Sequence, residues 1–180
     1  MKDRHAVIWT RLGAQPVKMG TLVVTDSDAR FSYEDNYADT GLRGLGLVYP
    51  PAAFSGTIVR KRTEYFDFHP PIKALIPARE ERNFQRALIT RYLAKAGVRP
   101  EPGFDTDWNI LIRAGHGGIG HIDVFENDEA ALQWYATPSR HDLVELDERF
   151  GFSLREFMTW YDGDADLLID LLGPTPTVGG

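Results

Sequence analysis

Val17-Lys-Met-Gly-Thr-Leu-Val-Val24 is rich in β-branched residues, as is typical of a β-strand. A similar run, His5-Ala-Val-Ile-Trp-Thr10, precedes it across a turn that contains glycine and proline. A third run, Ala29-Arg-Phe-Ser-Tyr33, alternates apolar and polar residues after an Asp-Ser-Asp turn signal at residues 26–28. Three strands joined by short turns predict an antiparallel meander.

Further segments are candidate strands. A stretch rich in glycine and proline carries Leu45, Leu47 and Tyr49 at alternate positions, which predicts a short strand followed by a loop. Trp108-Asn-Ile-Leu-Ile-Arg113 and His121-Ile-Asp-Val-Phe125 predict two more strands on either side of a tight glycine loop.

The clearest helix signal covers residues 78–96. Its apolar residues recur at helical spacing: Phe84, Leu88, Ile89, Tyr92 and Leu93. Glu80 and Glu81 would lie in the first turn and Lys95 in the last, which matches the helix dipole. Gly97 is placed to end the helix in a left-handed conformation. The spacing therefore predicts an amphipathic helix that packs on the sheet.

Three arginines, Arg79, Arg82 and Arg86, would share a second face of this helix. Solvated helix surface is one interpretation, and a patch that faces a partner is the other. The charge distribution bears on this choice. Residues 1–95 carry 15 Lys+Arg against 10 Asp+Glu, whereas residues 96–180 carry 5 against 16. The sharper hypothesis is that the basic front half meets an acidic partner, and the acidic rear half argues against direct binding of nucleic acid.

Helices dominate the rest of the chain. Asn127 is an N-cap signal for a short helix that runs to about Tyr135. Ser153-Leu-Arg-Glu156 is a capping box, and Asp164 can cap a last helix that Gly173 ends. The predicted fold class is α+β, a small, mostly antiparallel β unit packed with an amphipathic helix and followed by a helical segment. We divide the chain into residues 1–125, the helical segment 126–173 and the start of a glycine-rich loop at 174–180.

Composition sets outer limits on the function. Hydrophobic content is 43% and charged content 26%, which are ordinary values for a globular domain. The chain has no cysteine, so disulfides and thiolate metal sites are excluded. No apolar run approaches the ~20 residues of a membrane-spanning helix, and the charged start does not resemble a signal peptide. We expect a cytoplasmic protein with no membrane partner.

Several motif matches favour structural roles. Gly115-His-Gly117-Gly-Ile-Gly120 has the dinucleotide-binding spacing, but a strand is expected after it instead of a helix, so a hairpin turn is the better interpretation. His116 and His121 lack a third ligand, and we expect no metal site. His69 and His141 are expected at the surface. Aromatic residues in the helical segments favour packing over ligand stacking: Trp134, Tyr135, Phe157, Trp160 and Tyr161.

The last residues, Thr177-Val-Gly-Gly180, look like the start of a phosphate-cradling loop, because glycines let backbone N–H groups approach a phosphate. Thr177, Val178, Gly179 and Gly180 are thus candidate nucleotide-binding residues of an incomplete site. No lysine occurs after Lys95. We expect no catalytic residue and no cofactor for this chain by itself, and neither tight ATP binding nor phosphoryl transfer.

Taken in order, these pieces resemble the N-terminal portion of HipA-type serine/threonine kinases, the toxins of bacterial toxin–antitoxin modules linked to persistence. The resemblance covers nearly the whole chain. It rests on these segments: Val7-Ile-Trp9, Gly20-Thr-Leu22, Leu47-Val-Tyr-Pro-Pro51, Ile76-Pro77, Gly118-Ile-Gly120-His-Ile-Asp123 and Pro176-Thr-Val-Gly-Gly180. The segment Ala78-Arg-Glu-Glu-Arg82 departs from the acidic/glycine pattern common in the family after that proline.

The resemblance implies a parent kinase that uses ATP and Mg²⁺ to phosphorylate a serine or threonine on a protein of translation. It implies two partners, a helix-turn-helix antitoxin and the remaining kinase core. In the family the closing motif opens the ATP-binding glycine-rich loop, so Thr177 stands where a hydroxyl residue can be autophosphorylated. The family's phosphate lysine, catalytic aspartate and metal ligands have no counterpart in this sequence, so the chain is expected to be a fragment or truncated product.

Two alternatives stay open. Related three-gene modules encode this N-terminal unit as a separate small protein of the HipS type, which binds and inhibits the kinase. The chain could also be a generic protein-interaction module without any link to a toxin. Whether the reading frame continues past Gly180 separates the first two interpretations.

Overall fold

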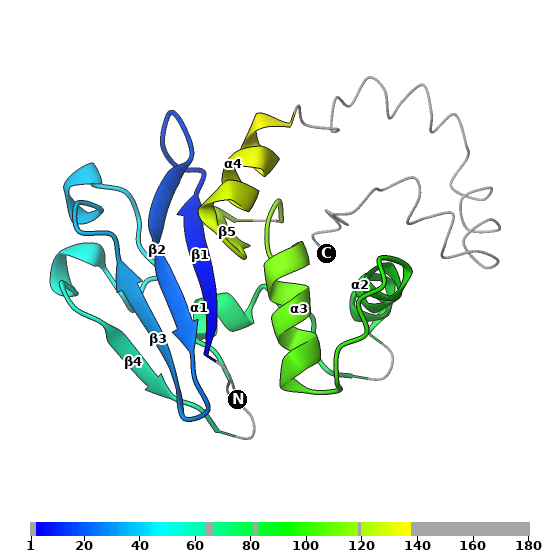
Figure 1. Cartoon of the computed structure of the whole chain (residues 1–180). Helices are drawn as coiled ribbons and strands as arrows, with labels where there is room; N and C mark the ends of the chain where they lie inside the picture. Colours follow the sequence, from blue (N-terminus) through cyan, green and yellow to red (C-terminus); the bar gives the residue numbers. More distant parts are fainter. Residues whose placement is uncertain (1–2, 64–66, 81–82, 119, 138–180) are drawn as a thin grey trace.

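The chain forms a five-stranded antiparallel sheet with several helices, an α+β fold that confirms the predicted class (Figure 1). The computed structural model describes residues 3–63, 67–80, 83–118 and 120–137. The strands are β1 (Arg4–Thr10), β2 (Val17–Val24), β3 (Asp28–Tyr33), β4 (Ile58–Lys61) and β5 (Ile122–Phe125). The helices are α1 (Pro70–Lys73), α2 (Phe84–Lys95), α3 (Phe104–Ala114) and α4 (Asp128–Ala136), with short 3-10 turns at Ala38–Thr40 and Pro51–Ala53.

The strand order is β4-β3-β2-β1-β5. β1, β2 and β3 form the predicted meander, with Ile8 opposite Gly20 and Leu22 opposite Phe31. The chain then adds β4 to one edge, passes through α1, α2 and α3, and returns as β5 beside β1. The two segments that flank β1 in the sheet, β2 and β5, are therefore far apart in the sequence.

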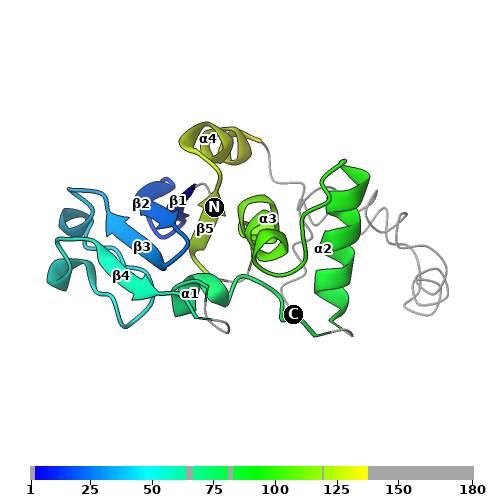
Figure 2. The ribbon, with the colours of Figure 1, turned by 60° about the horizontal axis from the view of Figure 1, so that its bottom comes forward.

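The sheet has two differently covered faces. Alternate side chains such as Ile8, Leu22 and Phe31 point into the main core, which α1 and α3 complete. Val7 and Phe125 point the other way and form a second cluster with α4. Figure 2 shows α4 and α1 on opposite sides of the sheet. One strand, β1, thus contributes to both cores.

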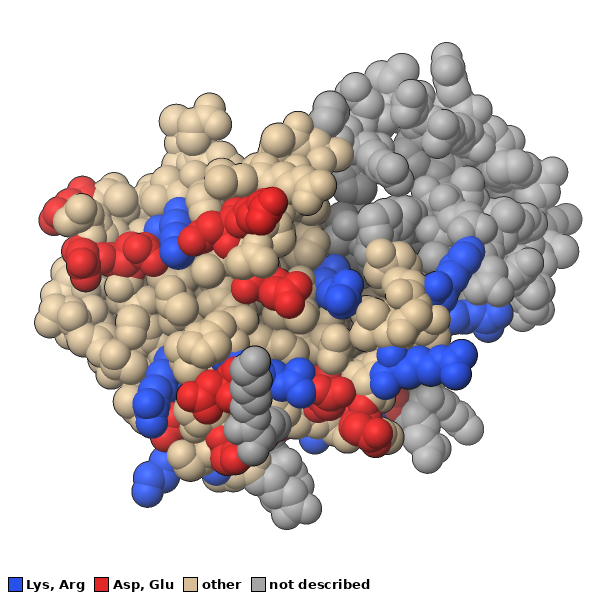
Figure 3. Space-filling view, viewed as in Figure 1, with Lys and Arg blue, Asp and Glu red and all other residues tan. Residues whose placement is uncertain are grey.

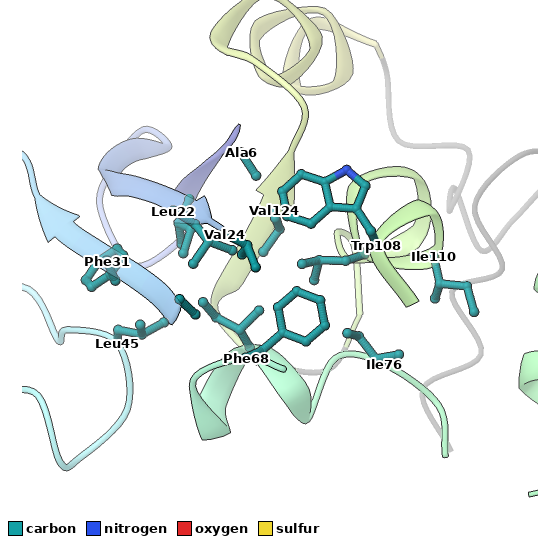
Figure 4. Packing of buried hydrophobic residues seen from close by; sticks show 14 of the residues in the cluster. Ala6, Leu22, Val24, Phe31, Leu45, Phe68, Ile76, Trp108, Ile110 and Val124 are labelled. Carbon is teal, nitrogen blue, oxygen red and sulfur yellow. The ribbon is translucent and has the colours of Figure 1, made fainter. Parts of the chain in front are cut away.

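An aromatic stack connects the segment before α1 to α3 (Figure 4). The ring of Phe68 lies 5.5 Å from that of Phe104 and 6.4 Å from that of Trp108, measured between centroids, and both contacts are stacked. Phe68 and Trp108 are buried together with Ile76 and Val124. Because aromatic pairs add to the free energy of burial, this stack helps to hold α3 against the segment before α1.

The predicted helix 78–96 is present, but it begins later. α2 starts at Phe84, and residues 78–80 lie outside it, so Glu80 is not in its first turn. Asn83 is the N-cap, and its side-chain oxygen accepts a hydrogen bond from the backbone N–H of Arg86 at 2.9 Å. Gly97 follows the helix with φ +78°, as predicted.

The predicted core face of α2 is largely confirmed. Leu88, Ile89 and Leu93 are buried, and Tyr92 is half-buried against the main core. The side chain of Phe84 lies outside the described part of the chain.

The predicted strand at 108–113 is wrong, because these residues belong to α3. Asp105 and Asp107 lie in the first turn of α3 and Arg113 in the last, an arrangement that stabilises a helix through its dipole. The side chains of Trp108 and Leu111, three positions apart, are buried on one side of it. Tertiary packing outweighed the strand propensity of the Ile-Leu-Ile run.

The predicted strand around Leu45–Tyr49 is also absent. Leu45 is buried, but Leu47 is 96% exposed, so the alternation does not mark one face of a sheet. The strand that pairs with β3 lies further on, at Ile58–Lys61. Loop contacts hold the earlier segment instead, because the Tyr33 hydroxyl accepts from the N–H of Leu45 at 2.7 Å and donates to the carbonyl of Tyr49.

The rest of the predicted helical segment falls partly outside the described residues. α4 and its N-cap Asn127 are confirmed. The helices predicted from Ser153 and Asp164 and the loop 174–180 lie outside the described residues. Within the described ranges no helix is long and apolar enough to cross a membrane.

Candidate functional site

The glycine-rich segment 115–120 joins a helix to a strand. Gly115 ends α3, its carbonyl accepts from the N–H of Val124 at 2.9 Å, and β5 begins at Ile122. The predicted hairpin between two strands is therefore wrong, because the segment before the turn is helical. The prediction that a strand follows it is confirmed, and a dinucleotide site requires a helix there.

A carboxylate of the chain itself fills this turn. Asp123 is fully buried, and its Oδ1 accepts from the N–H of Gly117 at 2.8 Å. Its Oδ2 accepts from the Tyr135 hydroxyl at 2.7 Å and lies 2.9 Å from Nε of Arg11. Gly117 has φ +75°, a conformation that favours glycine. Asp123 thus receives a backbone N–H of the kind that a phosphate would use.

Arg11 closes the same turn from outside. Its Nη2 donates to the carbonyls of Gly118 and Gly120 at 2.8 and 2.9 Å. Burial and the hydrogen bond to Asp123 raise the pKa of Tyr135, which keeps its hydroxyl a donor. These contacts support the structural interpretation of the glycine motif.

Within the described part of the chain, the densest ionic cluster surrounds Asp107 on α3. Asp107 is fully buried, and its Oδ2 accepts from Lys73 Nζ and from Arg79 Nε at 3.0 Å each. Nη2 of Arg86 lies 2.7 Å from its Oδ1, in a position that does not form a hydrogen bond. One carboxylate therefore holds α1, α2, α3 and the segment before α2 together.

A second buried acid, Asp67, extends this cluster. Its Oδ1 accepts from Nη2 of Arg62 at 3.0 Å, and its Oδ2 accepts from Nη2 of Arg79 at 2.8 Å. Arg79 therefore bridges Asp67 and Asp107. We call these six residues the ionic cluster: Arg62, Asp67, Lys73, Arg79, Arg86 and Asp107.

The contacts within the ionic cluster shift the pKa values of Asp107 and Arg79. Burial by itself raises the pKa of Asp107, but the hydrogen bonds from Arg79 and Lys73 and the ion pair with Arg86 outweigh it and hold the pKa below its ordinary value. Burial likewise lowers the pKa of Arg79, and the two carboxylates more than reverse that effect. Both groups are therefore charged at neutral pH.

The structure changes the interpretation of the three candidate arginines. Arg79 lies before α2, so it does not share a helix face with Arg86, and that part of the prediction is wrong. Arg86 is mostly buried and also donates to the carbonyl of Pro77 at 3.0 Å. Arg82 lies outside the described residues. Whether a partner also contacts Arg79 stays a prediction.

The histidines occupy separate environments. His69 was expected at the surface, which is wrong, because it is fully buried. Its Nε2–H donates to the carbonyl of Ala29 at 3.1 Å, and its ring packs edge-on against Tyr49. His116 donates from Nδ1 to the carbonyl of Val124 and stacks on Phe125. Among the described residues, no group of three metal-binding side chains occurs.

Some of the remaining candidates lie within the described residues, and the others lie outside them. Trp134 and Tyr135 pack against Val7 and Phe125, which confirms their predicted packing role. The candidates Thr177, Val178, Gly179 and Gly180 lie outside the described residues, as do His141, Phe157, Trp160 and Tyr161.

Sequence reasoning missed the buried acids Asp67, Asp107 and Asp123. A usable signal existed for Asp107, since an aspartate in the first turn of a helix is a stabilising pattern. No known protein family, curated protein or solved structure matches the chain.

Proposed function

We propose that this chain is the N-terminal accessory unit of a HipA-like serine/threonine kinase. Its role is to bind and position other parts of the toxin–antitoxin complex, namely the kinase core and a helix-turn-helix antitoxin. The parent would transfer phosphate from ATP, with Mg²⁺, to a serine or threonine of a protein of translation. The chemistry belongs to the core, because phosphoryl transfer needs metal ligands, a phosphate-binding cation and a residue that orients the nucleophile.

One observation carries the proposal. Of the segments behind the resemblance, those within the described residues are scattered from residue 7 to residue 123, yet they come together in one unit; Pro176-Thr-Val-Gly-Gly180 lies outside the described residues. Val7-Ile-Trp9 lies in β1, between Gly20-Thr-Leu22 in β2 and the closing part of Gly118–Asp123 in β5. Ile76 packs into the same core. An ordered set of short matches that folds into one unit supports common architecture more strongly than the matches do separately.

Surface charge is compatible with a binding role. In Figure 3 lysine and arginine side chains alternate with aspartate and glutamate along the lower part of the face in view. Mixed charge of this kind favours selective protein contacts, since each charge needs an opposite partner. A protein–protein role thus fits this face better than phosphate-backbone binding, which uses one sign of charge.

Calorimetry with Mg·ATP tests whether ATP binding requires the kinase core and is absent from this chain alone. We expect no binding heat from this chain, and saturable heat after the kinase core encoded at the same locus is added. We also expect the purified core to form a complex with the chain on a sizing column. Micromolar ATP affinity of the chain alone, or failure to associate with the core, would overturn the proposal. Inhibition of an active core by added chain would identify a separate inhibitory subunit instead.

A further inference from the structure

We propose that Lys73 and Arg79 form a binding site for a phosphate dianion, either free phosphate or a phosphorylated side chain. The site lies where α1 and the segment before α2 meet α3. The inference goes beyond the proposed function and does not depend on it, because it rests on the charge balance and geometry of the ionic cluster.

The ionic cluster carries more positive than negative charge. It joins four cations, Arg62, Lys73, Arg79 and Arg86, to the carboxylates Asp67 and Asp107. The described residues of the cluster therefore have a net charge of +2. Glu80, next to Arg79, is exposed and forms no ion pair with these cations. Excess charge in a partly buried site favours binding of an anion, because desolvated like charges repel strongly.

Two of the cations are mostly buried and have their partners inside the molecule. Arg62 donates to Asp67 and to the carbonyl of Thr25, and its guanidinium lies 4.0 Å from the ring centroid of Phe104. Arg86 pairs with Asp107 and donates to the carbonyl of Pro77. Both side chains are only 14% exposed. The capacity to bind a further anion must therefore reside in the other two cations.

Lys73 and Arg79 are the accessible cations of the cluster. Their side chains are 30% and 39% exposed. Lys73 Nζ has three N–H donors, of which one meets Asp107. Arg79 uses Nε and Nη2 for the two carboxylates. Among the described residues, Nη1 of Arg79 and the remaining hydrogens of Lys73 have no hydrogen-bond partner, so these donors can contact a ligand.

The two cations are close enough for one ligand. Lys73 Nζ and Arg79 Nε each lie 3.0 Å from the same oxygen, Oδ2 of Asp107, so the two nitrogens are at most 6.0 Å apart. Asp107 is fully buried on one side of this pair, and the side chains of both cations are partly exposed. Because a phosphate has several acceptor oxygens, different oxygens can accept from Lys73 Nζ and from Nη1 of Arg79.

Charge selects phosphate over a single carboxylate. A phosphate monoester carries about −1.5 to −2 charges at pH 7 and three acceptor oxygens. One such group balances the net +2 of the ionic cluster, whereas one carboxylate would leave a positive charge. An arginine fork beside a lysine is also a usual way to hold phosphate.

Titration of the isotopically labelled chain with inorganic phosphate at constant ionic strength tests the site. We expect saturable NMR shifts at Lys73, the Arg79 Nε–H and the N-terminal turn of α3, and weaker shifts with acetate. A second titration uses a phosphoserine peptide in place of inorganic phosphate. Tighter binding of the peptide than of phosphate identifies a phosphoprotein as the source, and equal binding identifies free phosphate. Absence of saturation with both ligands overturns the proposal.

Variants locate the site. Lys73→Met and Arg79→Met should each weaken phosphate binding roughly tenfold, because each removes a charged hydrogen bond. Lys61→Met, an exposed lysine on β4, is the matched control and should bind as the parent does. Circular dichroism checks the fold of each variant. If Arg79→Met unfolds, Lys73→Met decides, because its partner Asp107 keeps two arginines. Unchanged affinity in Lys73→Met would refute the site.

Discussion

Single buried polar residues hold separate segments of this fold together. Asp107 joins three helices, Asp123 fills the glycine turn, and His69 ties the start of α1 to β3. Each has its polar partners inside the molecule, as burial of a polar group requires. Loss of one such partner leaves its neighbours buried and unpaired, which costs more than loss of an exposed contact.

Asp107→Asn should destabilise the protein strongly. It keeps the shape of the side chain but leaves Lys73, Arg79 and Arg86 without their shared negative charge. Breaking a buried ionic group in this way costs roughly 3–5 kcal/mol. Urea unfolding measures the change, and Asp39→Asn at an exposed position is the control. Equal midpoints for the two variants would mean that the ionic cluster adds no stability.

Because of His69, we expect the folded protein to lose stability in acid. Burial lowers the pKa of His69 to about 4 from an ordinary 6.5, so the folded state prefers the neutral ring. Its contribution is fully present above pH 6.5 and is lost as the pH falls toward 4, by roughly 1.4 kcal/mol per pH unit. His69→Gln should be less stable at pH 7 but less sensitive to pH.

The measurement for His69 is the urea midpoint at several pH values between 7 and 4. His116 and His121 also have lowered pKa values, so the decisive quantity is the difference between the parent and His69→Gln. Parallel curves for the two proteins would show that His69 does not titrate with folding.

At the scale of elements, local sequence decides where α2 and α4 begin, whereas tertiary packing decides which of their faces is buried. Asn83 and Asn127 cap α2 and α4 through their own side chains, so local sequence sets where these helices begin. Their buried faces depend on what packs against them. α2 turns Ile89 and Leu93 toward the main core, and α4 turns Ala131 toward Val7 and Phe125 on the other side of the sheet.

Leu88→Ala tests the predicted face of α2. Leu88 is buried, and truncation of such a residue costs ~2–5 kcal/mol. Leu132→Ala on α4 is a matched control, because Leu132 is exposed and the same atoms are removed. We expect a large fall in the urea midpoint for Leu88→Ala and a small change for Leu132→Ala. A similar midpoint for both would place Leu88 outside the core.

At the scale of the whole molecule, the two hydrophobic clusters share strands. Val7 and Ile8 are neighbours in β1 but belong to different clusters, and Val124 and Phe125 divide in the same way in β5. Loss of packing on one face therefore shifts backbone that the other face also needs. This coupling favours unfolding of the described part as one cooperative unit.

Phe125→Ala measures this coupling. The change removes a large side chain from the second cluster, which costs about 3–5 kcal/mol. If the clusters unfold together, amide hydrogen exchange should accelerate in β2 and β3 as well as near α4. Exchange that accelerates only around α4, with β2 and β3 unchanged, would show two independent units.

Much of the fold could be predicted from local sequence. The meander, the strand at His121–Phe125, the capped α4 and the glycine after α2 were all predictable, because each depends on propensity, turn residues or caps within a few positions. The wrong predictions concern segments whose conformation depends on contacts with residues far away in the sequence. Trp108–Arg113 has strand propensity, but its contacts with Phe68 and the sheet bury one side of a helix.

The sequence by itself determined the α+β class and the order of its main pieces, because hydrophobic periodicity and turn signals are local. Only the tertiary structure decided that His69 is buried, that Arg79 bridges two acids and that Asp123 fills the glycine turn. These placements join residues far apart in the chain. Their partners are chosen by the desolvation cost of buried polar groups, which no local pattern records.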